Sequence, residues 1–237
     1  RVGTRNYLGV VTSVNCSATV ARRIAAHFTP ERLAAFPNVD GVCAFTHTSG
    51  CGMAKDGPGL ANLRRTLAGY ATHPNFAGLL IVGLGCEVNQ VDTLLADAGL
   101  APSPTLRTLG IQASGGTKAA IDAGIAEIEA MLPLANAVRR ATVDASHLVV
   151  GLQCGASDGY SGLTANPALG IAADRLVAAG GRVVLSETPE IYGAENLLLR
   201  RAATPAVAVT LVERLQWWEA HAKAQGADLD NNPSPGN

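Results

Sequence analysis

The stretch GLLIVGLGCEVNQVDTLLADAG, residues 78–99, contains one complete strand–loop–helix unit, which predicts the fold class. It begins with the apolar run GLLIVGLG at 78–85, which is far too short to cross a membrane and has the length of a buried strand. After a polar loop it continues as VNQVDTLLADAG at 88–99, where apolar residues recur at helical spacing. A strand that leads through a short loop into a helix is the repeating unit of an α/β fold.

The same unit recurs along the chain. The expected strands are 7–14, 39–45, 78–85, 105–111, 146–153 and 182–187, and segments of helical periodicity follow them. Strands separated by helices pair in parallel, and near-continuous apolar runs indicate burial on both faces. We therefore expect an α/β fold, a Rossmann-like three-layer domain with a mainly parallel sheet of about five or six strands. This domain is expected to cover residues 1–227, with 228–237 as an extended tail that leads to a missing C-terminal domain.

The composition excludes several classes of protein. Of the 237 residues, 48% are hydrophobic and 16% charged, and the formal net charge is −1, so no basic surface for nucleic acid or an anionic membrane is expected. No apolar segment reaches the roughly 18 residues of a membrane-spanning helix. Without a signal peptide, the expected location is the cytoplasm. The chain starts at Arg1 and stops at a turn-like NNPSPGN, which predicts a piece of a longer polypeptide.

The cysteines are odd in number and scattered, and none forms a C-x-x-C pair. This pattern argues against a disulfide framework and against a structural zinc site, so reduced thiols are expected. Cys43 lies within an expected strand and is interpreted as a small core residue. The five positions are Cys16, Cys43, Cys51, Cys86 and Cys154.

Three cysteines occupy the loops where a ligand is expected. Ligands of doubly wound folds bind outside the carboxyl ends of the strands. Cys51, Cys86 and Cys154 each follow a different expected strand, beside glycines, and are therefore predicted to lie close together as metal ligands. Three such thiolates can bind iron, or three corners of an iron–sulfur cluster. Cys16 precedes an N-cap serine, and its role is left open between a packed position and a functional one.

Groups able to move a proton are expected at the same edge. His47 lies on the loop that contains Cys51, and Glu87 directly follows Cys86. Asp158 follows the fifth expected strand and Glu187 ends the sixth, although Asp158 in a glycine-rich loop is also typical of an Asx-turn. We assign the catalytic role to these four residues.

The loop GIQASGGTK, residues 110–118, is the candidate for holding a carboxylate. It is not a phosphate loop, because Lys118 does not directly follow a glycine, and GLGCEVNQ lacks the third glycine of a dinucleotide fingerprint because Val88 stands there. Backbone amides at the start of the next helix can hold an anion, and a plain tight turn is the alternative. The residues assigned to substrate binding are Asn15, Ser114, Gly115, Gly116 and Ser157.

Long blocks of the sequence resemble one enzyme family. They are RVGTRNYLGVVTSVNCSATVARRIA, HTSGCGM, RRTLAGYATHPNFAGLLIVGLGCEVNQ, LQCGASDGYSGLTANPALG, LSETPEIYGAE and NNPSPGN. Together they are similar to the altronate dehydratase/galactarate dehydratase family, which also includes sulfolactate sulfo-lyase. The resemblance implies a sugar-acid dehydratase that depends on iron, as Fe²⁺ or an iron–sulfur cluster, or on another divalent metal. It also implies further N- and C-terminal domains of the same protein as partners.

The expected function is therefore the central domain of a metal-dependent hydro-lyase. It would dehydrate a sugar acid of the altronate or galactarate type to a 2-keto-3-deoxy acid, and the isolated chain is expected to be inactive. The alternatives are a sulfo-lyase that acts on sulfolactate and a non-catalytic Rossmann-like module that binds a ligand or positions other domains. The expected partner is a small sugar acid, not nucleic acid or a membrane, and a homo-oligomer is compatible with the sequence.

Overall fold

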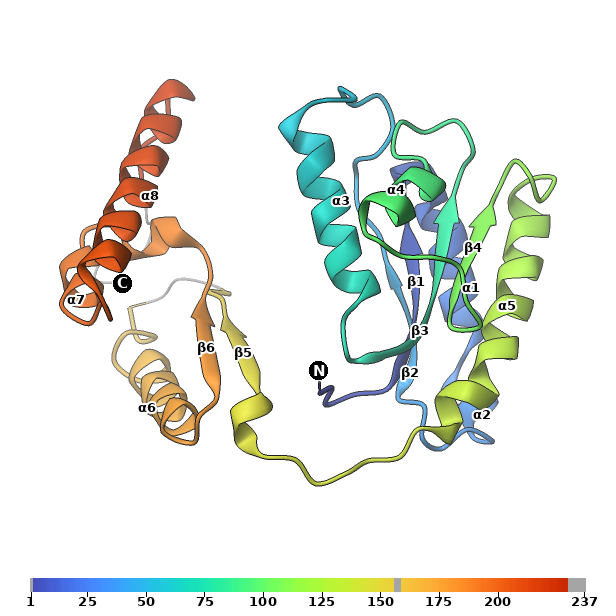
Figure 1. Ribbon diagram of the computed structural model, residues 1–237, viewed down its shortest axis with the longest axis horizontal. Coiled ribbons are helices and arrows are strands. Elements are labelled where there is room, and N and C mark those ends of the chain that lie inside the picture. The colour runs from blue at the N-terminus through green and yellow to red at the C-terminus, as the bar shows by residue number, and fades with distance from the viewer. Residues whose placement is uncertain (1, 156–158, 230–237) are drawn as a thin grey trace. The chain divides into compact units, whose positions relative to one another are not determined.

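Four parallel strands form the sheet of the first part of the chain (Figure 1). The computed structural model describes residues 2–155 and 159–229. The strand order is β2-β1-β3-β4, so β1 pairs with β2 on one side and with β3 on the other. The strands are β1 (Tyr7–Thr12), β2 (Gly41–Phe45), β3 (Phe76–Gly83) and β4 (Leu106–Gly110).

Helices cover both faces of this sheet, as parallel strands require. One face carries α1 (Ala18–His27) and α5 (Thr117–Ala137), and the other carries α3 (Pro58–Ala71) and α4 (Val91–Asp97). The short elements of this part are η1 (Asn15–Ser17) and α2 (Pro30–Leu33). The expected three-layer α/β architecture is therefore confirmed for this region.

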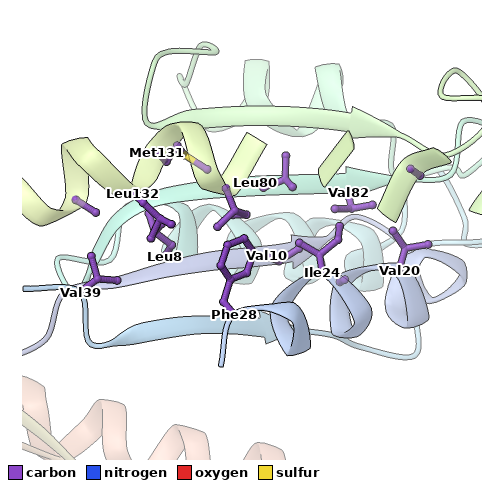
Figure 2. Packing of buried hydrophobic residues seen from close by; sticks show 14 of the residues in the cluster. Leu8, Val10, Val20, Ile24, Phe28, Val39, Leu80, Val82, Met131 and Leu132 are labelled. Atoms are coloured by element: carbon purple, nitrogen blue, oxygen red, sulfur yellow. The ribbon is translucent and has the colours of Figure 1, made fainter. Parts of the chain in front are cut away.

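The two faces of β3 enter two separate clusters of buried side chains. Leu80 and Val82 pack with residues of α1 and α5, and Figure 2 shows them beside Ile24 and Met131. Residues 79 and 81 point the other way and pack with α3 and α4. Because successive side chains of a strand alternate between faces, a run of consecutive apolar residues is what a doubly covered strand needs.

The second part of the chain contains a smaller sheet. Its two strands, β5 (Val149–Leu152) and β6 (Arg182–Leu185), pair in parallel. The helix α8 begins at a Thr204 cap whose hydroxyl accepts the Val207 N–H (3.3 Å). The other elements are η2 (Ala145–His147), α6 (Ala165–Ala178), η3 (Thr188–Ile191), α7 (Glu195–Leu199) and α8 (Pro205–Ala224).

The expectation of one domain and one sheet through residue 227 is wrong. The chain divides into two compact units, Arg1–Ala141 and Thr142–Asn237, each with its own sheet. The sequence pattern does not mark the boundary, because strand–helix alternation continues across it. Most of the tail expected at 228–237 lies outside the described residues. Within them, no helix combines the length and apolar character needed to cross a membrane.

Candidate functional site

The loops after β1, β2 and β3 meet at the carboxyl edge of the four-stranded sheet. From β1 the chain first adds β2 on one side and later adds β3 on the other side. The strand order therefore reverses beside β1, and the crevice at such a reversal is where open α/β sheets bind ligands. The loops in question comprise residues 13–17, 46–53 and 84–90.

Backbone hydrogen bonds tie these three loops together. The Asn15 N–H donates to the carbonyl of Ser49 (2.8 Å), which joins the first loop to the second. The Asn89 N–H donates to the carbonyl of Gly50 (3.2 Å), which joins the third loop to the second. The loops are thus held in a fixed arrangement by their own main chain.

Gly50 lets two of these loops approach more closely than a side chain would allow. Its φ of +96° lies in the region that favours glycine. A Cβ atom placed there would lie 2.4 Å from the Ser13 carbonyl oxygen and 2.8 Å from the Cα of Val14. Both contacts are with backbone, so a larger residue would push the loops that contain Cys16 and Cys51 apart.

The side chain of Asn89 is completely buried and bridges separate elements. Its Nδ2 donates to the Ser13 carbonyl (2.9 Å), and its Oδ1 accepts the Nε–H of Arg64 on α3 (3.2 Å). The Arg64 guanidinium also pairs with Asp97 (2.6 Å). No role was predicted for Ser13, Arg64 or Asn89, although Ser13 is a polar residue directly after the apolar strand β1, which is a signal.

Glu87 acts as an acceptor within its own loop. The carboxylate is 4% exposed and accepts the Ser13 hydroxyl (2.7 Å), the Leu84 N–H (3.1 Å) and the Gly85 N–H (2.6 Å). Burial by itself would raise its pKa, but these hydrogen bonds together outweigh burial and hold the pKa of Glu87 below its ordinary value. A carboxylate so engaged holds the loop in place, and the geometry does not favour the catalytic role predicted for Glu87.

His47 is also engaged by backbone on both sides of its ring. Its Nδ1 accepts the Ser49 N–H (3.2 Å), so the proton of the neutral ring lies on Nε2, which donates to the Thr12 carbonyl (3.0 Å). This arrangement fixes the tautomer and orients the loop that precedes Cys51. It favours a positioning role for His47 over the predicted proton transfer.

Three free and exposed thiols, Cys16, Cys51 and Cys86, gather on these loops. The pKa of Cys16 is raised, first by partial loss of hydration, next by the charge of the Cys51 thiol and a hydrogen bond with it, and also by the charge of Cys86. Cys16 is therefore close to both of the other thiols. Cys43 in β2 is different, because burial raises its pKa to about 11, as a packed thiol requires.

Cys154 lies in the second unit, two residues after the end of β5. Its N–H donates to the Glu187 carboxylate (2.8 Å), and the Gln153 side chain donates to the same group (3.3 Å). The prediction that Cys154 lies beside Cys51 and Cys86 assumed a single sheet, whereas the strands that precede these residues belong to two separate sheets. The placement of Cys154 at that site stays a prediction. The predicted site residues Ser157 and Asp158 lie outside the described residues.

The loop before α5 forms a tight turn. Gly115 and Gly116 have φ values of +85° and +115°, and their N–H groups donate to the carbonyls of Gln112 (3.1 Å) and Ile111 (3.0 Å). The Ser114 N–H and hydroxyl both donate to one carbonyl of the same loop. These donors are therefore used within the turn, which favours the turn interpretation of this loop over the predicted carboxylate site.

A hollow of about 550 Å³ lies between α3 and α4. Arg64, Arg65 and Lys55 line it together with Asp56 and Asp97. It connects to the loop network through Arg64, whose Nε–H is bound by Asn89. Within residues 2–155 and 159–229, no group of three or more His, Cys, Asp or Glu side chains is arranged to hold a single metal ion.

Two family models match the chain, and they divide it near the boundary between the two structural units. Residues 1–136 match the model described as D-galactarate dehydratase/Altronate hydrolase, second domain. Residues 145–237 match the model described as D-galactarate/Altronate dehydratase, C-terminal. Residues 137–144, between the two matches, contain the point where the first unit ends.

Curated relatives with related names cover the whole chain. An altronate dehydratase of Bacillus subtilis (strain 168) is 34% identical over 99% of the chain, and an altronate dehydratase of Escherichia coli (strain K12) is 36% identical over 100%. The galactarate dehydratase (L-threo-forming) of Escherichia coli (strain K12) is 38% identical over 100%. In each case the match covers 46% of the relative, so the chain spans about half the length of the curated relatives it matches.

Proposed function

The chain belongs to the D-galactarate dehydratase/altronate hydrolase family, and from this premise we propose that it supplies two domains of a sugar-acid dehydratase. The proposed reaction removes water from an acid of the altronate or galactarate type and yields a 2-keto-3-deoxy acid. The observation that carries this proposal is the match of both structural units to consecutive domains of one family. The activity is proposed for the longer protein, because the chain corresponds to about half of its relatives.

The reaction is demanding because the proton next to a carboxylate is weakly acidic and hydroxide is a poor leaving group. A bound iron would supply a Lewis acid for the departing hydroxyl. Exposed thiolates are donors of the type that iron accepts in proteins, and the carboxyl edge of the first unit presents three of them. The donor set of this chain therefore fits the iron dependence that we propose.

Residues of the first unit would shape the binding site around that edge. Glu87 and Asn89 hold the loops through buried hydrogen bonds, and His47 orients the loop that precedes Cys51. The Asn15 carboxamide is exposed beside the Cys16 thiol (Oδ1 to Sγ, 3.6 Å). Its Nδ2 group can donate a hydrogen bond to a hydroxyl or carboxylate oxygen of the substrate. We therefore retain Asn15 as a proposed substrate-binding residue.

Proton transfer is proposed for the second unit. Glu187 is an exposed carboxylate that the Cys154 N–H and the Gln153 side chain orient. A carboxylate held in position at a loop after a strand is a group that can accept a proton from a carbon acid. Asp158 remains a proposed catalytic residue and Ser157 a proposed substrate-binding residue.

The test is turnover by the full-length protein prepared without oxygen. Galactarate, altronate and sulfolactate are supplied separately, and formation of a 2-keto-3-deoxy acid or release of sulfite is measured. We expect the keto acid from one of the two sugar acids, and no product from residues 1–237 alone. Turnover of sulfolactate alone would replace the proposal with a sulfo-lyase, and absence of turnover with all three acids would overturn it.

A further inference from the structure

We propose that Cys16, Cys51 and Cys86, all in the first unit, together bind an iron–sulfur cluster through three thiolates. The sequence pattern pointed to a different set, which included Cys154 and left Cys16 open. The choice of iron rests on the proposed function, whereas the choice of ligands rests on the geometry of the carboxyl edge. Three cysteines leave one corner of a four-iron cluster without a protein ligand, and that corner is open to a substrate oxygen.

The main chain brings the three cysteines to one place. Cys16 follows Asn15, whose N–H donates to the carbonyl of Ser49, two residues before Cys51. The residue between them, Gly50, accepts the N–H of Asn89, three residues after Cys86. Each of the three loops is therefore tied to another within three residues of its cysteine.

Hydrogen bonds of buried side chains stabilise this arrangement of the loops. The Ser13 hydroxyl, three residues before Cys16, donates to Glu87, the residue after Cys86 (2.7 Å). The Ser13 carbonyl accepts the side chain of Asn89 (2.9 Å). Since Ser13, Glu87 and Asn89 are all buried, the first and third loops are joined by contacts that water does not reach.

The thiols of Cys16, Cys51 and Cys86 lie near one another and are open to solvent. The side chains of Cys16 and Cys51 are hydrogen-bonded to each other, and Cys86 is near enough to Cys16 to interact with it electrostatically. A cationic cofactor would favour the deprotonated sulfurs. All three side chains are exposed, so a cofactor can reach them without unfolding the unit.

A cluster can accept thiolates from three separate loops more readily than one ion can. A single tetrahedral ion with metal–sulfur bonds of about 2.3 Å requires all its sulfurs within about 4 Å of one another. In the part of the chain that the structure describes, no group of three ligands is arranged in that way. In a cluster each thiolate binds a different iron, so the sulfurs lie further apart and can come from three separate loops.

The experiment is reconstitution of the full-length protein with ferrous iron and sulfide under nitrogen. Iron and sulfide content, visible absorption and the electron paramagnetic resonance spectrum after reduction are measured without substrate. We expect Cys16→Ser, Cys51→Ser and Cys86→Ser to lose the cluster, while Cys154→Ser and Cys43→Ser retain it. Circular dichroism of each variant separates loss of the cluster from loss of the fold.

A second pair of variants leaves every thiol in place. Gly50→Ala would push the first two loops apart, whereas Gly52→Ala places its Cβ where no atom lies within 4 Å. We expect Gly50→Ala to bind less iron and sulfide than Gly52→Ala when both give the circular dichroism of the unaltered protein. If Gly50→Ala does not fold, the cysteine variants decide.

Three outcomes would overturn the proposal: a Cys16→Ser protein with full iron and sulfide content, loss of the cluster in Cys154→Ser, or iron bound without sulfide. Because the readout needs no turnover, its failure is separate from failure of the proposed function. A protein that dehydrates a sugar acid but binds no cluster would leave the function standing and remove this inference.

Discussion

The two units place similar apolar strands in very different surroundings. In β1 and β3 of the first unit, Leu8, Val10, Leu80 and Val82 are fully buried. In the second unit, Val149 on β5 is 58% exposed and Leu185 on β6 is 57% exposed. The difference shows that an apolar strand is buried by its neighbours, because a four-stranded sheet covered on both faces excludes water where a two-stranded sheet does not.

Buried polar groups show the same contrast. Among the described residues, the buried polar side chains all belong to the first unit, where they join loops at the edge of the sheet; they are Thr12, Ser13, Ser17, Glu87 and Asn89. A polar group is buried at low cost only where partners surround it, and a packed core provides the rigid frame that positions such partners. The packed core of the first unit therefore holds the loops at the edge of its sheet in a fixed arrangement.

The largest test of this comparison is to separate the units. We expect residues 1–141 to unfold in one cooperative transition, and residues 142–237 to show no such transition, because an isolated two-stranded sheet is marginal in water. Circular dichroism during heating and the dispersion of amide proton shifts measure this. A cooperative transition with dispersed shifts for residues 142–237 would break the comparison.

A matched pair of leucines tests the difference within the intact chain. Leu80→Ala removes a fully buried side chain from β3, and we expect it to lower the free energy of unfolding by about 2–5 kcal/mol. Leu185→Ala removes a side chain from β6 that is 57% exposed, and we expect about 1 kcal/mol or less. Urea denaturation measures both, and equal losses would contradict the contrast.

Replacing each of two glutamates by glutamine should give the smallest change in the free energy of unfolding, and this change should depend on pH. Glu87→Gln should lower the free energy of unfolding by about 1–3 kcal/mol at neutral pH, because the buried carboxylate accepts three hydrogen bonds. The exposed Glu187, replaced in the same way, should cost less. Since folding lowers the pKa of Glu87, its contribution is present above the ordinary value of about 4.3 and is lost as the pH falls below it.

Urea denaturation at several pH values between about 7 and 3 checks this sign. The stability of the unaltered protein should approach that of Glu87→Gln as the pH falls through the folded-state pKa of Glu87. A difference that stays constant or grows toward acid would show that the carboxylate is not held ionised by its loop.

Much of the fold was predictable from periodicity. The strands expected at 7–14, 39–45, 78–85 and 105–111 contain or overlap β1 to β4, because doubly covered strands leave an unmistakable apolar run. The boundary at residue 141 was not predictable, because both units alternate strands and helices in the same way. Which strands pair with which is decided by packing between segments far apart in sequence, and a local pattern does not contain that information.

The location of the candidate site could be predicted from the sequence, but the full set of residues that form it could not. The carboxyl edge and the loops with Cys51 and Cys86 followed from the pattern. Cys16 was left open because a cysteine before an N-cap serine has the same local signature whether it is packed or exposed. Asn89 was missed because its role depends on contacts with Gly50 and Arg64, which only the folded chain brings within reach.

The pairing of β1 with both β2 and β3 also sets the order of events during protein synthesis. A nascent chain that ends before residue 86 contains Cys16 and Cys51 without the third thiol and without the Asn89 bridge. At about 5–20 residues per second, the 35 residues from 52 to 86 take roughly 2–7 s to synthesise. All three ligands of the proposed cofactor are therefore present only after translation has passed Cys86, and until then two exposed thiols are open to oxidation.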